Sequence, residues 1–322
     1  MIAMKRVIFD VLGASGAGAI ARRATCHSPR VLMYHGFRED ADIRPGHMSR
    51  TDFAKQLAYI KRYYTPWKLS DLVKYYNDNG IYPENSVAIT VDDGYENFYS
   101  IALPLLKKFG IPATVFVVAK AADENRWLWT DIITHLFNST PALNGHQQIK
   151  ITSSLKAMSP TQRNRALHDL LSNYAILIPP TPPPKYRLMS WSQLREAFNC
   201  GLVEVGAHSC THPILAYLDS EESRQEILGA KQIIEHRLGL EVTSYCYPNG
   251  QPGDYTEEHK KLIISSGYTC CTASHPGFVE HHSDHYALPR IACQPRINRF
   301  RLDVDGLIHI YLACRAALNR SQ

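Results

Sequence analysis

Short runs of apolar residues recur along the chain, and each ends abruptly at polar residues or at glycine. The runs are VLMYHG (31–36), VAITVDDG (87–94), ATVFVVA (113–119), LVEVGAHS (202–209), SYCYPNG (244–250), TCCTAS (269–274) and ALPRIAC (287–293). Apolar runs of this length between turn-forming residues predict short, buried β-strands.

Between these runs, apolar residues recur at the three- and four-residue spacing of amphipathic helices. Phe53, Leu57 and Ile60 fall on one such helical face, and Gly239 ends the longest of these patterns. The patterns cover residues 51–63, 71–77, 101–109 and 220–238. Strands that alternate with helices indicate parallel strands joined by crossover helices, so we expect a barrel rather than an antiparallel sandwich.

Residues 119–189 break this alternation. They contain WLWTDIITHLF, a polar helix-like run at 159–174 and the proline-rich sequence IPPTPPPK. We predict a mostly helical insertion that returns to the barrel through a stiff loop. The barrel itself is expected over residues 28–312, between an N-terminal segment (1–27) and a C-terminal tail (313–322).

The composition is that of a folded domain with a large core. Of the 322 residues, 45% are hydrophobic and 20% are charged. We interpret the basic excess near the two ends as a solvated face, with attraction to an anionic glycan or a phospholipid surface as the alternative. No nucleic-acid motif is evident. The excess, within a net charge of +5, lies in Arg22, Arg23, Arg30, Arg296, Arg299, Arg301, Arg315 and Arg320.

The cysteines and the N-terminus bear on the compartment. The eight cysteines form no CxxC pair, which favours reduced thiols. Residues 1–21 have the outline of a signal peptide, but Asp10 interrupts the apolar stretch and Arg22 stands where a cleavage site should lie. We expect a cytoplasmic protein, with a short helix on the inner membrane face as an option for residues 1–27.

Polar side chains stand where several predicted strands end. Because the carboxyl ends of parallel strands open on one face of a barrel, these side chains can converge although they are far apart in sequence. They are His35, Asp92, Asp93, His208, the segment 247–250 and Arg290.

His208 and His212 are four residues apart and follow a strand, so both imidazoles can point toward one ion. With one carboxylate from the Asp92–Asp93 pair, they supply the ligand count of a catalytic zinc that keeps positions open for water and substrate. The second carboxylate would deprotonate that water. Taken singly, each motif also has an ordinary explanation, since Asp-Gly is a common turn and histidines bond to the backbone.

Several of these motifs are similar to those of a known family. ITVDDGY (89–95) resembles the first motif of the NodB-homology polysaccharide deacetylases, carbohydrate esterase family four, and HSCTHP (208–213) resembles their second. VLMYHGF, YPNG and LPRI look like the family's bacterial exopolysaccharide branch. The resemblance spans residues 31–307 and implies a distorted (β/α)7-type barrel.

The resemblance implies roles for individual residues. Asp92 is expected to be the catalytic base, and Asp93, His208 and His212 the ligands of one divalent metal, zinc in the first instance with cobalt or nickel as alternatives. The backbone N–H of Asn249 is expected to stabilise the oxyanion. Cys210, between the two histidines, is not expected to be a ligand.

The chain departs from the family pattern at two places. Tyr245 and Cys246 stand where an arginine usually precedes the proline of the third motif, so we assign its role to Arg290. The C-terminal leucine-x-histidine motif has only a loose counterpart ending at His309. In circularly permuted relatives the general acid lies near the N-terminus, so we expect His35 to be the acid, across the metal from Asp92.

The implied activity is metal-dependent hydrolysis of N-acetyl groups on amino sugars, with an N-acetylated glycan or glycan precursor as partner. Two alternatives stay open. One is an inactive glycan-binding barrel, although loss of activity usually removes a ligand or the base. The other is a different metal-dependent amidohydrolase or phosphoesterase, although two-metal chemistry would need more carboxylates at strand ends.

Overall fold

The computed structural model describes residues 16–42 and 46–320. Within this part of the chain, seven parallel strands close into a barrel, because β1 pairs with β10 on one side and with β5 on the other. The predicted distorted (β/α)7-type barrel is therefore confirmed. In order around the barrel the strands are β1 (Arg30–Tyr34), β10 (Leu288–Ala292), β9 (Cys270–Pro276), β8 (Ser244–Cys246), β7 (Val203–Ala207), β6 (Ala113–Val117) and β5 (Ser86–Val91).

The distortion is visible in the pairing of β5. A further strand, β4 (Thr65–Trp67), pairs with the first half of β5, whereas β6 pairs with Thr90 and Val91 in its second half. The register of β10 against β9 also shifts between Leu288 and Arg290. The barrel is therefore closed, but its strands do not all pair along their full length. A separate two-stranded sheet joins β2 (Phe37–Arg38) to β3 (Met48–Ser49).

Alternate residues of the strands pack into different clusters, as the two-residue period of a strand requires. In β5, Val87 and Ile89 pack in the large cluster that contains the inner faces of the outer helices, whereas Ala88 packs with Phe116 and Leu288 in a second cluster. Every residue of β5 is buried, as expected for parallel strands covered on both faces.

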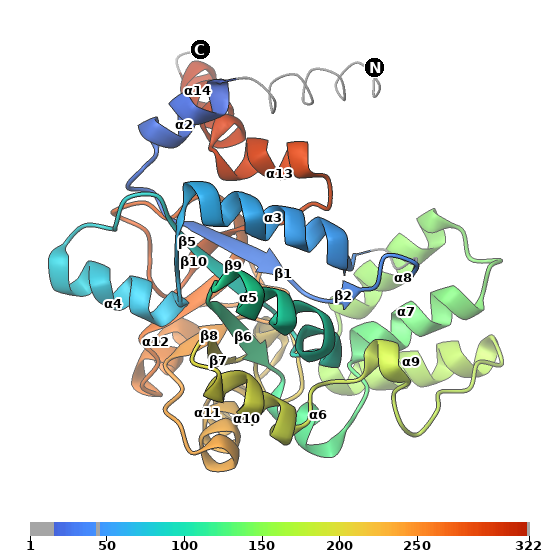
Figure 1. Ribbon diagram of the computed structural model, residues 1–322. Coiled ribbons are helices and arrows are strands. Elements are labelled where there is room, and N and C mark those ends of the chain that lie inside the picture. Colours follow the sequence, from blue (N-terminus) through green and yellow to red (C-terminus); the bar gives the residue numbers. More distant parts are fainter. Residues whose placement is uncertain (1–15, 43–45, 321–322) are drawn as a thin grey trace.

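Helices cover the outside of the barrel (Figure 1). The helices predicted from spacing are present, and Phe53, Leu57 and Ile60 are all buried. The outer helices are α3 (Arg50–Tyr63), α4 (Leu69–Asn79), α5 (Leu103–Phe109) after the π-helical turn η1 (Phe98–Ala102), α10 (Trp191–Asn199), α11 (Ser220–Leu238), α12 (Glu257–Ser265) and α13 (Ile297–Val304).

Four helices and a short turn separate β6 from α10. These helices share a small apolar cluster of their own, made of Trp129, Ile133, Leu155 and Leu167. Figure 1 shows α7, α8 and α9 grouped at one side of the barrel. These elements are α6 (Ala119–Glu124), α7 (Trp129–Ser139), α8 (Gly145–Lys156), α9 (Pro160–Asn173) and the 3-10 turn η2 (Pro184–Tyr186).

The first and last helices of the described chain, α2 (Ala17–Ala24) and α14 (Leu307–Arg320), lie against each other beside the barrel. The Arg22 side chain is mostly buried and donates to Asp305 at 2.8 Å, and Arg30 is completely buried. The interpretation of these two arginines as a solvated basic face is therefore wrong.

The membrane-surface helix proposed for residues 1–27 lies mostly outside the described residues. Among the helices that the structure describes, none is both long and apolar enough to cross a membrane. α14 continues to Arg320 and so takes in most of the segment 313–322.

Candidate metal centre and catalytic rim

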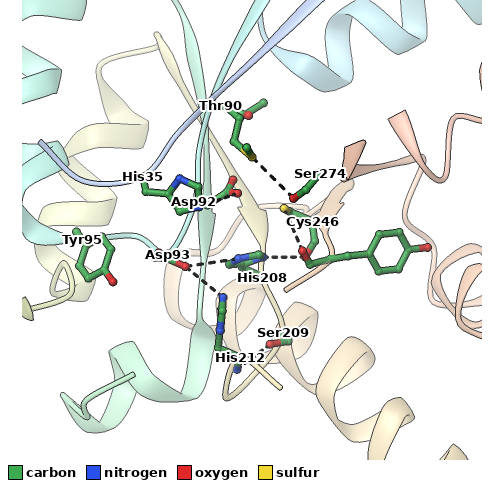
Figure 2. A network of polar contacts seen from close by, with 12 residues as sticks. His35, Thr90, Asp92, Asp93, Tyr95, His208, Ser209, His212, Cys246 and Ser274 are labelled. Carbon is green, nitrogen blue, oxygen red and sulfur yellow. Dashed lines mark hydrogen bonds and ion pairs between the residues drawn. The ribbon is translucent and has the colours of Figure 1, made fainter. Parts of the chain in front are cut away.

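The loops that follow β5 and β7 bring three predicted ligands together. Asp93 follows β5, and His208 and His212 follow β7; all three are buried. The Oδ1 atom of Asp93 lies 3.5 Å from Nε2 of His208 and 3.3 Å from Nε2 of His212. Figure 2 shows the carboxylate pointing between the two rings.

These separations fit a metal better than direct hydrogen bonds. Side-chain hydrogen bonds between nitrogen and oxygen are usually about 2.7–3.2 Å long. Two ligands bound tetrahedrally at about 2.0–2.2 Å lie about 3.3–3.5 Å apart. His208 Nδ1 donates to the Cys246 carbonyl at 2.8 Å, which leaves the Nε2 lone pair directed at Asp93. The residues present therefore fit one divalent ion.

Backbone strain is concentrated at this site. Seven non-glycine residues of the described chain have positive φ, and four of them are Asp93 (71°), Ser209 (64°), His212 (62°) and Asn249 (62°). Each such conformation costs on the order of 1–3 kcal/mol and persists only where surrounding contacts enforce it. Here the Ser209 hydroxyl accepts from the His212 N–H at 2.9 Å, and Trp129 of α7 donates to the His212 carbonyl at 2.8 Å.

Asp92, next to Asp93, has entirely different neighbours. Arg290 from β10 donates to both of its carboxylate oxygens, at 2.7 and 2.8 Å, and both side chains are buried. Burial alone would raise the pKa of Asp92, but the Arg290 guanidinium, together with the nearby His35 and His208, outweighs it and holds that pKa below its ordinary value. Asp92 is therefore an ionised carboxylate near neutral pH, as a general base must be.

The missing arginine of the third motif has a structural explanation. Arg290 Nη2 lies 3.3 Å from the Cys246 sulfur, so a guanidinium from β10 fills the space beside the small side chain on β8. Arg290 also donates to the Ala273 carbonyl at 2.8 Å and to the Thr90 hydroxyl at 3.1 Å. The arginine is thus fixed by three strands of the barrel.

His35 follows β1, so it lies at the same end of the barrel as Asp92, Asp93, His208 and His212. We call this end, where the strands finish, the catalytic rim. Its Nε2 lies 3.8 Å from Oδ2 of Asp92, and 47% of its side chain is exposed, against 3% for Asp92. His35 therefore stands beside Asp92 rather than across from it, and no acetamide fits directly between these two atoms. A hollow of about 260 Å³ opens next to His35 and is lined also by Gly36, His47 and Gln294.

His309 lies at the other end of the barrel. Its ring stacks on Phe278 at 4.4 Å, and its Nε2 lies 3.3 Å from Glu280. Phe278 in turn packs 4.4 Å from the guanidinium carbon of Arg30, which begins the strand that His35 follows. The two candidate acids are therefore on opposite rims, and only His35 is near Asp92.

Asn249 follows β8 and is held by the insertion. Its Oδ1 accepts from Lys156 at the end of α8 at 2.6 Å, and its Nδ2 donates to Asp254. Asp254 also accepts from the backbone N–H of Gln251 at 2.7 Å. The loop expected to carry the oxyanion N–H is therefore fixed from two sides.

Sequence reasoning missed the contribution of the inserted helices to the rim. Besides Lys156 and Trp129, Asp131 of α7 is buried and accepts from the Tyr95 hydroxyl at 2.9 Å. Burial raises the pKa of Asp131 well above its ordinary value, and the nearby Asp93 charge adds to the rise. The sequence signals for these contacts are weak, because each residue type is common in helices. Cys210 is buried, and its thiol donates to the Gln225 carbonyl at 3.4 Å.

Comparison with known proteins gives matches to a protein family and to individual relatives. The family described as polysaccharide deacetylase matches residues 79–271, more than half of the chain. YxkH of Bacillus subtilis, named for the same family, is 23% identical over 269 residues, which cover 82% of this chain and 71% of YxkH. The poly-β-1,6-N-acetyl-D-glucosamine N-deacetylase of Staphylococcus aureus (strain MSSA476) is 31% identical over 98 residues, which cover 30% of this chain and 34% of that enzyme.

Solved structures share the fold. The Streptococcus pyogenes deacetylase PplD in complex with acetate superposes with a TM-score of 0.61 at 16% identity and covers 88% of this chain and 98% of its own. IcaB from Ammonifex degensii gives a TM-score of 0.56 at 18% identity, with 85% of this chain and 97% of its own covered.

Proposed function

Because the chain belongs to the polysaccharide deacetylase family, we propose that Asp93, His208 and His212 hold one divalent metal beside which Asp92 catalyses removal of N-acetyl groups from amino sugars. The observation that carries this proposal is the different surroundings of two adjacent aspartates. Asp93 faces two imidazoles at 3.3 and 3.5 Å, and Asp92 faces a guanidinium. One carboxylate is thus suited to bind a cation and the other to accept a proton.

The metal, when bound, would polarise the acetamide carbonyl and make a water molecule easier to deprotonate. Asp92 takes a proton from that water, and Arg290 keeps its carboxylate oriented through two hydrogen bonds. The water oxygen attacks the carbonyl carbon, and the Asn249 backbone N–H donates to the oxygen that becomes negatively charged. His35 donates a proton to the departing nitrogen, so that the C–N bond breaks to give acetate and a free amine.

The proposed metal is zinc. Two imidazoles and one carboxylate form a borderline ligand set, which cobalt or nickel can also occupy. A second group of candidate ligands at this rim consists of Asp92, His208 and Cys246. Within this group, Arg290 already contacts both the Asp92 carboxylate and the Cys246 sulfur. The cation already present there favours a one-metal site over two-metal phosphoesterase chemistry.

The proposed substrate is an N-acetylated amino-sugar polymer of the exopolysaccharide type, or its precursor, at the cytoplasmic side of the membrane. The S. aureus relative acts on poly-β-1,6-N-acetyl-D-glucosamine, as its name states. The hollow of about 260 Å³ beside His35 is smaller than most ligand pockets, which suits a single sugar unit. All eight cysteines are free thiols, a state that a reducing compartment preserves.

The proposal is tested by acetate release from a panel of N-acetylated glycans after chelation and after addition of zinc, cobalt or nickel. We expect acetate only with added metal, and only from substrates with an N-acetylated amino sugar. A chain that binds these glycans but releases no acetate with any metal would favour the glycan-binding alternative.

A further inference from the structure

A second group of metal-binding side chains lies at the opposite end of the barrel from the catalytic rim. Cys26 and His27 follow α2, and Glu84 stands just before β5. One ligand atom from each, the sulfur, a ring nitrogen and a carboxylate oxygen, lie within 4.8 Å of one another. None of these residues takes part in the proposed reaction.

The backbone holds these two segments together although they are far apart in sequence. The Asn85 N–H donates to the Cys26 carbonyl at 2.6 Å, and Asn85 has a positive φ of 52°, which turns the chain directly after Glu84. β1 and β5 are paired from Arg30 and Val87 onward, so both segments are anchored to adjacent strands. The three side chains therefore converge on a scaffold that does not depend on an ion.

The His27 ring has the orientation of a ligand. Its Nδ1 lies 3.2 Å from the carbonyl of Tyr82, a buried residue, and donation to a carbonyl makes Nδ1 the protonated nitrogen. The Nε2 lone pair is then free and lies 3.6 Å from the Glu84 carboxylate. This separation is longer than a good hydrogen bond and close to the about 3.3–3.5 Å between nitrogen and oxygen ligands of a tetrahedral ion. Histidine ligands of metals commonly donate their other ring N–H to a carbonyl in this way.

We propose that Cys26, His27 and Glu84 bind a second divalent ion of the zinc class, with water completing its coordination. A thiolate, an imidazole and a carboxylate together form a set of intermediate softness that suits zinc and cobalt. The ion has no part in hydrolysis. It links the end of α2 to the start of β5, so it stabilises the fold at the N-terminal ends of the strands.

Cobalt tests this site because only a thiolate ligand gives an intense charge-transfer band in the near ultraviolet. The background is His208→Ala, since His208 belongs to both candidate groups at the catalytic rim. We expect the His208→Ala protein to bind one cobalt ion per chain with this band, and to gain thermal stability when zinc is added. Adding Cys26→Ser should abolish the band and the stabilisation by zinc, and Glu84→Gln should weaken binding at least tenfold.

Cys200→Ser in the same background is the matched control, because Cys200 is also partly buried but belongs to none of these groups. It should leave the band unchanged. A His208→Ala protein that binds no cobalt, or a band that persists after Cys26→Ser, overturns the second site. Neither result affects the catalytic proposal. That proposal fails instead if the His208→Ala protein, which should lack the catalytic ion, keeps wild-type activity.

Discussion

Two arginines on neighbouring strands are completely buried, one near each end of the barrel. One faces a carboxylate, and the other faces backbone carbonyls. Arg290 on β10 faces the carboxylate of Asp92 at the catalytic rim. Arg30 on β1 donates to the carbonyls of Val304 (2.9 Å), Thr25 (2.6 Å) and Ser28 (2.7 Å). Burial would lower the pKa of both guanidinium groups; the Asp92 charge reverses this at Arg290, whereas the pKa of Arg30 stays lowered.

The difference shows how each end of the barrel uses a buried charge. At the catalytic rim, a cation keeps a buried carboxylate ionised, as the proposed role of Asp92 as a base requires. At the other rim, a cation binds the carbonyls at the ends of α2 and α13, where unpaired helix carbonyls carry partial negative charge. One end of the barrel therefore carries the proposed reaction, and the other holds the ends of α2 and α13 to β1.

The largest effect is expected from the adjacent aspartates. Asp92→Asn removes the proposed base and should lower turnover by about 10² to 10⁴ while leaving metal content near wild type. Asp93→Asn should lose the metal together with the activity. Elemental analysis and acetate release on both proteins check this, with thermal unfolding to confirm that they fold. Loss of metal from Asp92→Asn but not from Asp93→Asn would mean that the two roles are reversed.

His35 and His309 test whether the general acid belongs to the catalytic rim. His35→Ala should keep the metal and lower turnover of an N-acetyl glycan by about 10²-fold, because the departing amine needs a proton. An activated acetyl ester, whose leaving group needs no proton, should be hydrolysed almost normally. His309→Ala should behave as wild type on both substrates. An active His35→Ala protein paired with an inactive His309→Ala protein would refute this assignment.

Much of the catalytic rim could be predicted because its residues belong to short motifs at strand ends. The pair Asp92 and Asp93, the two histidines and the strand-end position of His35 are all local signals. Arg290 could be assigned because the third motif lacks its usual arginine. The contacts of Arg30 could not be predicted, since it binds backbone carbonyls, which every residue has and no sequence marks. Lys156 reaches a residue 93 positions away, a contact that no local pattern encodes.

Arg290→Met and Arg30→Met compare the two ends of the barrel directly. Each should destabilise the fold by about 3 kcal/mol, because each leaves buried acceptors unpaired. Only Arg290→Met should change the pH profile. Without the guanidinium, burial raises the pKa of Asp92, so the acidic limb of the kcat/KM profile should move about 1–3 pH units upward. Arg30→Met should leave that limb in place. Denaturant unfolding and pH profiles on both proteins check the difference.

Protein stability should depend on pH through the ion pair of Asp92 and Arg290. The pKa of Asp92 is depressed in the folded state, so its stabilising contribution is complete above the unfolded value of about 3.9 and is lost as the pH falls through the lower folded value. The free energy of unfolding of the wild type should thus decrease below about pH 4. In Arg290→Met the folded pKa is no longer depressed, so this part of the decrease should disappear. An unchanged pH dependence would mean that Arg290 does not control the ionisation of Asp92.

The smallest effect is expected from Lys156, which tests how far the catalytic rim extends into the inserted helices. Lys156→Met removes the 2.6 Å hydrogen bond to Asn249, but Asp254 still holds the other end of that amide. The loop should therefore loosen rather than unfold, and its N–H should meet the oxyanion less well. We expect a five- to tenfold lower kcat, about 1–1.4 kcal/mol, with KM and metal content nearly unchanged.

Lys156→Arg, which can still donate to Asn249, should recover most of the lost turnover. Lys150→Met is the matched control, because Lys150 is an exposed lysine on the same helix. It should have wild-type kinetics. If Lys156→Met raises KM and leaves kcat unchanged, the lysine contacts the glycan rather than positioning the loop. Equal losses in both methionine variants would point to a general effect of charge on α8, and the insertion would then lie outside the catalytic rim.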